Sequence, residues 1–173
     1  MKTSNIPIDL ILAQKHAWEP SGYICSEITQ NSESQEYSAY SFLLGDKSIV
    51  FRIAKITPTK IGQFVTLWIR SEKGPIIPYH KDDKIDTFIV LVRQGEKFGQ
   101  FIFPKKVLIE KGIISQNGRL GKLAIRVYSS WDITENPQAK RTQKWQSEYF
   151  IEIGTNGVIS EENREKVKLL LGM

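Results

Sequence analysis

The chain has 173 residues, of which 40% are hydrophobic and 25% are charged, and its formal net charge is +5. This length and composition exclude a fibrous or disordered chain, so we expect residues 1–173 to form a single globular domain. The single cysteine, Cys25, excludes an intramolecular disulfide, and no stretch resembles a signal peptide or a membrane span, so we expect a cytoplasmic location and no membrane partner.

The N-terminal part predicts a helix followed by a loop. A helix is expected over residues 6–17, because Asn5 can cap it and Pro7 suits its first turn. Residues 30–35 are polar and typical of a loop.

The middle of the chain is predicted to form β-strands. Gly45-Asp46-Lys47 is a turn signal between two segments in which apolar and polar residues alternate, and this pattern predicts a β-hairpin. About six strands are expected in all, over residues 37–44, 48–56, 63–70, 86–93, 99–103 and 122–128. A long loop marked by Gly74-Pro75 and Pro78 separates the third from the fourth.

Helices are again predicted toward the C-terminus. Pro104 predicts a short helix that stops at Gly112, Asn136-Pro137 caps a helix to about Phe150, and Ser160 opens a last helix to Leu171. Strands gathered between helical ends predict an α+β domain with a largely antiparallel or mixed sheet.

Positive charge is concentrated in the strand-rich middle. Residues 47–144 contain 19 lysines and arginines against 8 aspartates and glutamates, a net charge of +11, while both flanking segments are net acidic. So uneven a distribution attracts anions. The alternative is a solvated basic surface that only keeps the chain soluble.

Two segments offer contacts to phosphate. Thr57-Pro58-Thr59-Lys60 lacks the glycine spacing of a nucleotide-binding P-loop, yet it places cations and hydroxyls around one turn. On the late helix, Lys140 and Lys144 are four residues apart and Arg141 lies between them, so like charges share one surface. The alternatives are a proline turn and an ordinary solvated helix face.

Aromatic residues recur in the basic region, and stacking aromatics in a basic groove suit single-stranded nucleic acid. Most fall at strand periodicity and are better explained as core. Tyr79, Tyr128 and Trp131 lie in or beside loops and are the candidates for the surface.

No complete catalytic or metal-binding motif is present in the sequence. His16 and His80 lack partners at ligand spacing, so we expect no metal and no cofactor. Asp86 opens an apolar strand and could serve a Mg²⁺-dependent nuclease with Glu36 or Gln100. The next strand, however, has Gln100-Phe101-Ile102 where such a site needs an acidic residue with a lysine two positions on.

Taken in order, these landmarks resemble the MepB-like family of small bacterial proteins. The resemblance covers about residues 36–150, and the segments that carry it are 51–68, Gly74-Pro75, Pro78-Tyr79, Asp86, Gly99-Gln100-Phe101, Pro104-Lys105, 124–128, Trp131-Asp132 and 138–146. It implies nucleic-acid binding and supplies no catalytic residues.

The leading hypothesis is a non-enzymatic protein that binds DNA or RNA through a basic central surface. The phosphate contacts would come from Arg52, Lys55, Lys60, Arg126, Lys140, Arg141 and Lys144, with Tyr128 and Trp131 as stacking residues. The alternatives are a degenerate Mg²⁺-dependent nuclease and an adaptor that binds an acidic protein or a small anionic ligand.

Overall fold

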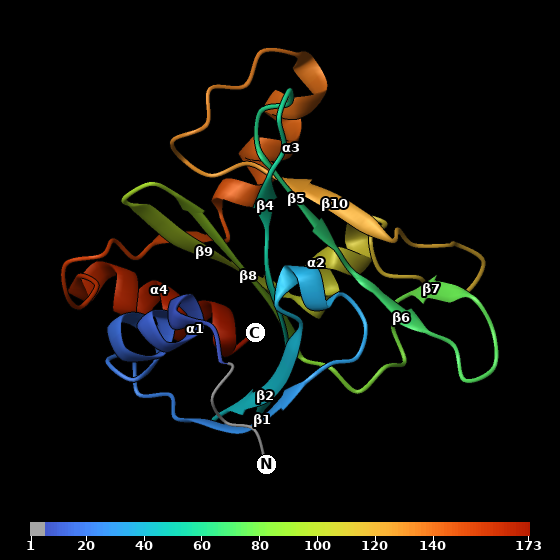
Figure 1. Ribbon diagram of the computed structural model, residues 1–173, viewed down its shortest axis with the longest axis horizontal. Coiled ribbons are helices and arrows are strands. Elements are labelled where there is room, and N and C mark those ends of the chain that lie inside the picture. The colour runs from blue at the N-terminus through green and yellow to red at the C-terminus, as the bar shows by residue number, and fades with distance from the viewer. Residues whose placement is uncertain (1–5) are drawn as a thin grey trace.

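The structure, a computed structural model that describes residues 6–173, is built around a six-stranded mixed sheet, called sheet A (Figure 1). Its strands in spatial order are β1 (Cys25–Gln30), β2 (Tyr40–Leu44), β3 (Lys47–Ile53), β8 (Thr87–Gln94), β9 (Lys97–Pro104) and β11 (Phe150–Glu152). The central β3 and β8 are parallel, and every other neighbouring pair is antiparallel. The first six residues of β8 are buried without a break, which explains its continuous apolar sequence.

Helices from both ends of the chain cover one face of sheet A. α1 (Ile8–Ala13) continues into a π-helical turn, η1 (Gln14–Trp18), and α4 (Glu161–Leu171) contacts this turn (Figure 1). The Trp18 indole is fully buried and donates to Gln100 Oε1 on β9 over 2.9 Å. This hydrogen bond and the surrounding apolar side chains form the first of two cores.

The opposite face of sheet A is covered by a three-stranded antiparallel sheet, sheet B, and by two helices. Sheet B has the order β10 (Ala124–Val127), β5 (Gln63–Thr66) and β4 (Lys55–Ile56), and the helices are α2 (Lys105–Glu110) and α3 (Pro137–Ser147). Residues of β5 and β10 alternate between buried and half-buried. Sheet B therefore has one face in the second core against sheet A and one face open to solvent.

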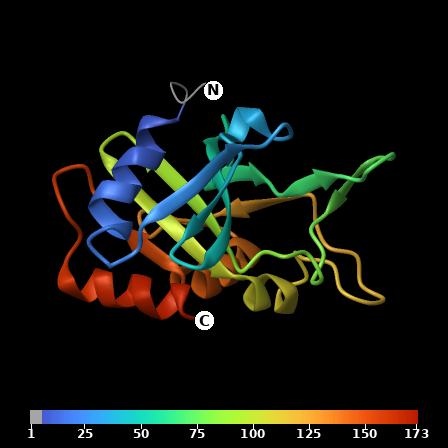
Figure 2. The same cartoon turned by 90° about the horizontal axis from the view of Figure 1, so that it is seen from below.

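A smaller hairpin projects from the body of the protein. It consists of β6 (Trp68–Arg70) and β7 (Ile76–Pro78), which extend away from the two larger sheets (Figure 2). A short 3-10 turn, η2 (Gln35–Tyr37), precedes β2. Within residues 6–173, no helix is both long enough and apolar enough to cross a bilayer.

Several sequence predictions are confirmed. The domain is α+β, with a mixed sheet between helical ends. The turn at Gly45-Asp46 joins β2 to β3 as a hairpin. Asn136 caps α3 by accepting the N–H of Ala139, and Ser160 caps α4 by accepting the N–H of Asn163.

Other boundaries were wrong for identifiable reasons. The strand predicted over residues 63–70 is divided at Leu67, because β5 pairs with β10 whereas β6 pairs with β7. β1 was missed because a register shift and a positive φ of 55° at Glu27 interrupt its alternation. β7 and β11 have only three residues each, too few to show a period. Because Phe150 already belongs to β11, α3 ends at Ser147 and not at about Phe150 as predicted.

The first helix also differs from its prediction. α1 starts at Ile8, and Pro7 immediately precedes it. The last part of the predicted helix is the separate π-helical turn η1. The predicted capping residue Asn5 lies outside the described residues.

Candidate functional site

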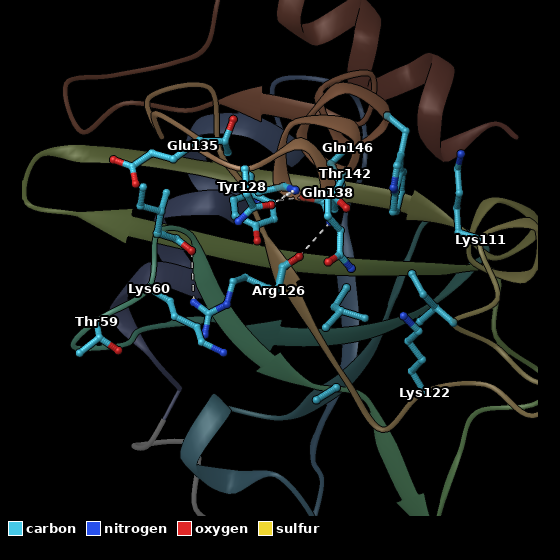
Figure 3. A pocket seen from close by; sticks show the side chains of 18 residues that line it. Thr59, Lys60, Lys111, Lys122, Arg126, Tyr128, Glu135, Gln138, Thr142 and Gln146 are labelled. Atoms are coloured by element: carbon cyan, nitrogen blue, oxygen red, sulfur yellow. Dashed lines mark hydrogen bonds between the residues drawn. The ribbon is translucent and has the colours of Figure 1, made fainter.

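A cavity of about 630 Å³ lies between β10, α3 and the loop that joins β4 to β5 (Figure 3). Four cationic side chains from three separate segments line it, namely Lys60, Lys111, Lys122 and Arg126. Glu135 is the one carboxylate among the lining residues. Within residues 6–173, none of the four cations forms an ion pair with a carboxylate, so their charge is not neutralised locally.

The loop at one end of the cavity requires glycine at its last position. Gly62 has a φ of +83°, and a Cβ there would come within 2.8 Å of the Tyr128 ring and 2.9 Å of the Val127 carbonyl oxygen. Only glycine adopts this conformation without strain and admits the ring so closely. The loop and Tyr128 are thus fixed against each other at the cavity wall.

Arg126 is held in place by the same loop. Its Nη1 donates to Thr57 Oγ1 over 3.0 Å and to the Gly62 carbonyl over 3.2 Å, and the guanidinium lies 5.8 Å from the centre of the Phe64 ring. These contacts use one nitrogen and leave the rest of the guanidinium fork to receive an anion.

Glutamine side chains attach α3 to β10, an edge strand of sheet B, and to the loop that follows it. Gln146 donates to the Arg126 carbonyl over 3.1 Å and accepts the N–H of Tyr128 over 2.8 Å. Gln143 donates to the carbonyls of Ser129 and Asp132 over 3.0 and 2.8 Å. These hydrogen bonds therefore hold α3 and β10, which both border the cavity, in a fixed arrangement.

Trp145 supplies an aromatic surface to the cavity. Its ring lies 5.6 Å from that of Phe103 and 6.3 Å from that of Tyr149, which fixes the indole on the core. The Lys111 amine sits 5.2 Å from the centre of the indole, a favourable cation–π arrangement.

Positive charge continues from the cavity across the open face of sheet B. Lys55, Phe64 and Arg126 are direct cross-strand neighbours on β4, β5 and β10, so their side chains share one face. The Lys55 amine lies 5.1 Å from the centre of the Tyr37 ring, and Tyr37 in turn lies 6.2 Å from Phe64. Cations and half-buried aromatics thus alternate along this face.

The structure brings some of the predicted site residues together. Lys60, Arg126 and Tyr128 line the cavity, and Lys55 lies on the adjoining open face. Lys140, Arg141 and Lys144 are exposed on α3. Because the cavity is lined by Gln138, Ala139, Thr142, Trp145 and Gln146, helical geometry turns Lys140 and Lys144 to the other side of the helix.

Arg52 is not a surface residue, and its prediction as a phosphate contact was wrong. Its side chain is fully buried and donates to Tyr79 Oη over 3.1 Å, to the Phe51 carbonyl over 2.9 Å and to Asn31 Oδ1 over 3.3 Å. The cause is that sheet B covers the second face of β3, so both faces of this strand are interior.

The prediction that Tyr79 is a surface aromatic needs the same correction, whereas the stacking role of Trp131 stays a prediction. Tyr79 is buried beneath Phe88, and burial raises the pKa of its hydroxyl, which remains neutral beside Arg52. Trp131 is half-buried and packs edge-on against Phe150 at 5.6 Å. Each contributes to the second core, and neither lines the cavity.

Residues that the sequence did not identify include Lys111, Gln138 and Thr142. Their convergence depends on β10 pairing with β5 across some sixty residues of sequence, for which no local pattern exists. Trp145, on the same helix as Gln138 and Thr142, both packs on the second core and lines the cavity.

Asp86 and Gln100, two residues of the nuclease alternative, do not converge. Asp86 Oδ2 accepts the N–H of Ser48 over 2.8 Å at the start of β8, while Gln100 is buried several residues along β9 and is bonded to Trp18. Within the described part of the chain, no three His, Cys, Asp or Glu side chains gather to hold a metal ion.

Comparison with known proteins identifies the family. The MepB-like family profile matches residues 31–152. The chain is similar to a solved structure described as "Crystal Structure of MepB", with 34% sequence identity and a TM-score of 0.74 over 90% of this chain and 100% of that one. No curated protein matches the chain. The matched profile and this structural relative show that the chain belongs to the MepB-like family.

Proposed function

We propose that this MepB-like protein binds nucleic acid in the basic cavity and on the adjoining open face of sheet B. The observation that carries the proposal is the convergence of Lys60, Lys111, Lys122 and Arg126 on one cavity without ion-pair partners among residues 6–173. Cations kept free of carboxylates retain their full attraction for phosphate.

Aromatic side chains beside these cations favour a single strand over a purely ionic partner. Trp145 and Tyr128 line the cavity, and Phe64 and Tyr37 lie among the cations of the open face. A basic groove with interleaved aromatics suits a backbone whose bases are free to stack, each stacked base contributing ~1–3 kcal/mol.

The exposed α3 cations have a secondary place in this proposal. Lys140, Arg141 and Lys144 lie outside the cavity, so they would contact phosphates of a strand that extends beyond it. Their loss should weaken binding of long strands more than that of short ones, because short strands do not reach the outer side of the helix.

Fluorescence anisotropy of labelled single-stranded DNA, duplex DNA and RNA tests the proposal. The informative variant is K60A/K122A, because both side chains are exposed and neither makes a hydrogen bond within residues 6–173. Its charge-matched control is K15A/K168A, which changes two exposed lysines on the helical layer.

We expect K60A/K122A to weaken single-strand binding by at least ~10-fold, since each charge-assisted contact contributes about 1.5–3 kcal/mol. K15A/K168A should bind within about twofold of wild type, in line with a purely long-range effect. Equal losses in both variants would show that net charge, not the cavity, is responsible. Binding of acidic proteins with no nucleic-acid binding would favour the adaptor instead.

A further inference from the structure

The cationic side chains of the cavity are divided between its two ends. Figure 3 shows Lys60 and Arg126 together at one end and Lys111 and Lys122 at the other. A single phosphate would need one such pair. Two pairs on one cavity fit a ligand that carries a phosphate on each side of its central part.

The part between these ends is polar and aromatic. Tyr128, Gln138, Thr142 and Gln146 lie there (Figure 3), and the cavity also borders the Trp145 indole. Within residues 6–173, the Gln138 amide and the Thr142 hydroxyl make no side-chain hydrogen bond, whereas the nitrogen and the oxygen of the Gln146 amide each make one to the backbone of residues 126–128. An amide and a hydroxyl without partners, beside an indole, suit the edge and the flat face of a nucleobase.

Size limits what can enter. A volume of about 630 Å³ is that of a small-molecule site, since such sites span about 300–1,000 Å³. It is large enough for one nucleotide with both of its phosphates. A duplex presents paired and stacked bases, so a base could reach the interior only if it is unpaired.

From these observations we infer that the cavity holds one unpaired internal nucleotide of a strand, with its 5′ and 3′ phosphates on the two cationic pairs and its base in the polar and aromatic centre. This inference rests on the proposed nucleic-acid binding and adds to it the unit that is recognised. The neighbouring nucleotides lie along the open face of sheet B, where Lys55 and Phe64 continue the row from Arg126.

The test uses small probes that separate the two phosphates. Isothermal titration calorimetry of the full chain compares thymidine 3′,5′-bisphosphate, thymidine 5′-monophosphate, thymidine and inorganic phosphate. We expect the bisphosphate to bind at least ~10-fold more tightly than the monophosphate, because it alone occupies both ends. Thymidine and inorganic phosphate should bind more weakly than either.

Variants assign the ends and the centre. K60A and K122A should each reduce the advantage of the bisphosphate over the monophosphate to within about threefold, since one cationic pair is weakened in each. The uncharged change Q138A/T142V should weaken the bisphosphate about threefold to tenfold and leave inorganic phosphate unchanged. K15A/K168A is again the control, with unchanged affinities.

The outcomes separate this inference from the proposed function. Equal affinity for bisphosphate, monophosphate and inorganic phosphate would overturn the two-ended site, even if single strands still bind. A bisphosphate that binds tightly but does not displace a bound single strand would also overturn it. Absence of binding to every polynucleotide would instead refute the proposed function. If the bisphosphate nevertheless bound to the wild type more tightly than to K60A or K122A, the cavity would be a site for a free nucleotide with two phosphates.

Discussion

The guanidinium of Arg126 on β10 and the hydroxyl of Thr57 after β4 lie 3.0 Å apart, with Arg126 as the donor. Arg126 lies on one edge strand of sheet B and Thr57 follows the other, so the hydrogen bond joins β10 to the loop between β4 and β5. It holds one side of the guanidinium fork, together with the carbonyl of Gly62. Thr57 therefore positions a cation of the cavity without lining the cavity itself.

Replacing Thr57 by valine should weaken nucleic-acid binding without unfolding the protein. Valine keeps the shape and removes the hydroxyl that fixes Arg126, a loss of about 1 kcal/mol, which corresponds to roughly fivefold in affinity. Thr57→Ser retains the hydroxyl and should bind within about twofold of wild type. Anisotropy with a single strand measures both, and equal affinities for T57V and T57S would show that Arg126 needs no support from this position.

Removal of Glu135 should have the opposite effect. Its carboxylate is the one negative side chain among the cavity-lining residues, and it opposes the approach of phosphate. Glu135→Gln should tighten single-strand binding about twofold to fivefold at low salt, and the gain should shrink as salt screens the charge. Weaker binding by E135Q would instead mean that Glu135 accepts a hydrogen bond from the ligand.

Arg52 should prove to be a stability residue. Replacement by methionine leaves the Tyr79 hydroxyl without its buried donor, which costs ~1–3 kcal/mol. It also removes the hydrogen bonds to the Phe51 carbonyl and to Asn31 Oδ1, although Asn31 Oδ1 still accepts from Ser41. We expect R52M to lose about 2–4 kcal/mol in the free energy of unfolding, measured by urea denaturation.

The double variant R52M/Y79F separates the two possible roles of Arg52. It should recover part of the lost stability, because the orphaned hydroxyl is gone with its donor. Folded R52M should bind nucleic acid like wild type. A variant as stable as wild type that binds ~10-fold more weakly would restore Arg52 as a phosphate contact.

Cys25 should be unreactive in the folded protein. Burial, with a smaller contribution from Glu19, raises the pKa of its thiol to about 12, so very little thiolate is present at neutral pH. At about pH 8, iodoacetamide should alkylate the native protein at least ~100-fold more slowly than the urea-unfolded chain. Similar rates would mean that the thiol is not protected by the fold.

The same shift gives a direction for stability against pH. The folded state favours the neutral thiol, so this contribution is complete below the unfolded pKa of about 8.5. It is lost as the pH rises from there toward about 12, the pKa of Cys25 in the folded state. Cys25→Ser should therefore flatten the fall in stability on the alkaline side, measured by urea denaturation at several pH values.

Local signals were sufficient for the elements that depend on neighbours in sequence. The Gly45-Asp46 turn, the Asn136 cap and the Ser160 cap each act over a few residues, and all three are present as predicted. Strand pairing is different, because β3 is parallel to β8 although about forty residues separate them. No short pattern specifies that pairing.

The difference between local signals and long-range packing also explains which site residues could be predicted from the sequence. Lys60 and Arg126 were identified because each lies in a segment that is recognisable by itself, a proline turn and a basic strand. Arg52 was misassigned because a charged residue in a strand is normally on the solvent side, and only the packing of sheet B on sheet A removes that side. Lys111 joins the cavity through the position of α2, which the sequence does not specify.

A salt titration of single-strand binding measures how many phosphates the protein contacts. The logarithm of the association constant should fall linearly with the logarithm of salt concentration, with a slope of about −0.7 for each phosphate contacted. K60A/K122A should reduce the magnitude of this slope by about 1.4, corresponding to two lost contacts, while K15A/K168A should leave it unchanged. A wild-type line that is flat, or a slope that K60A/K122A does not alter, would contradict phosphate binding in this cavity.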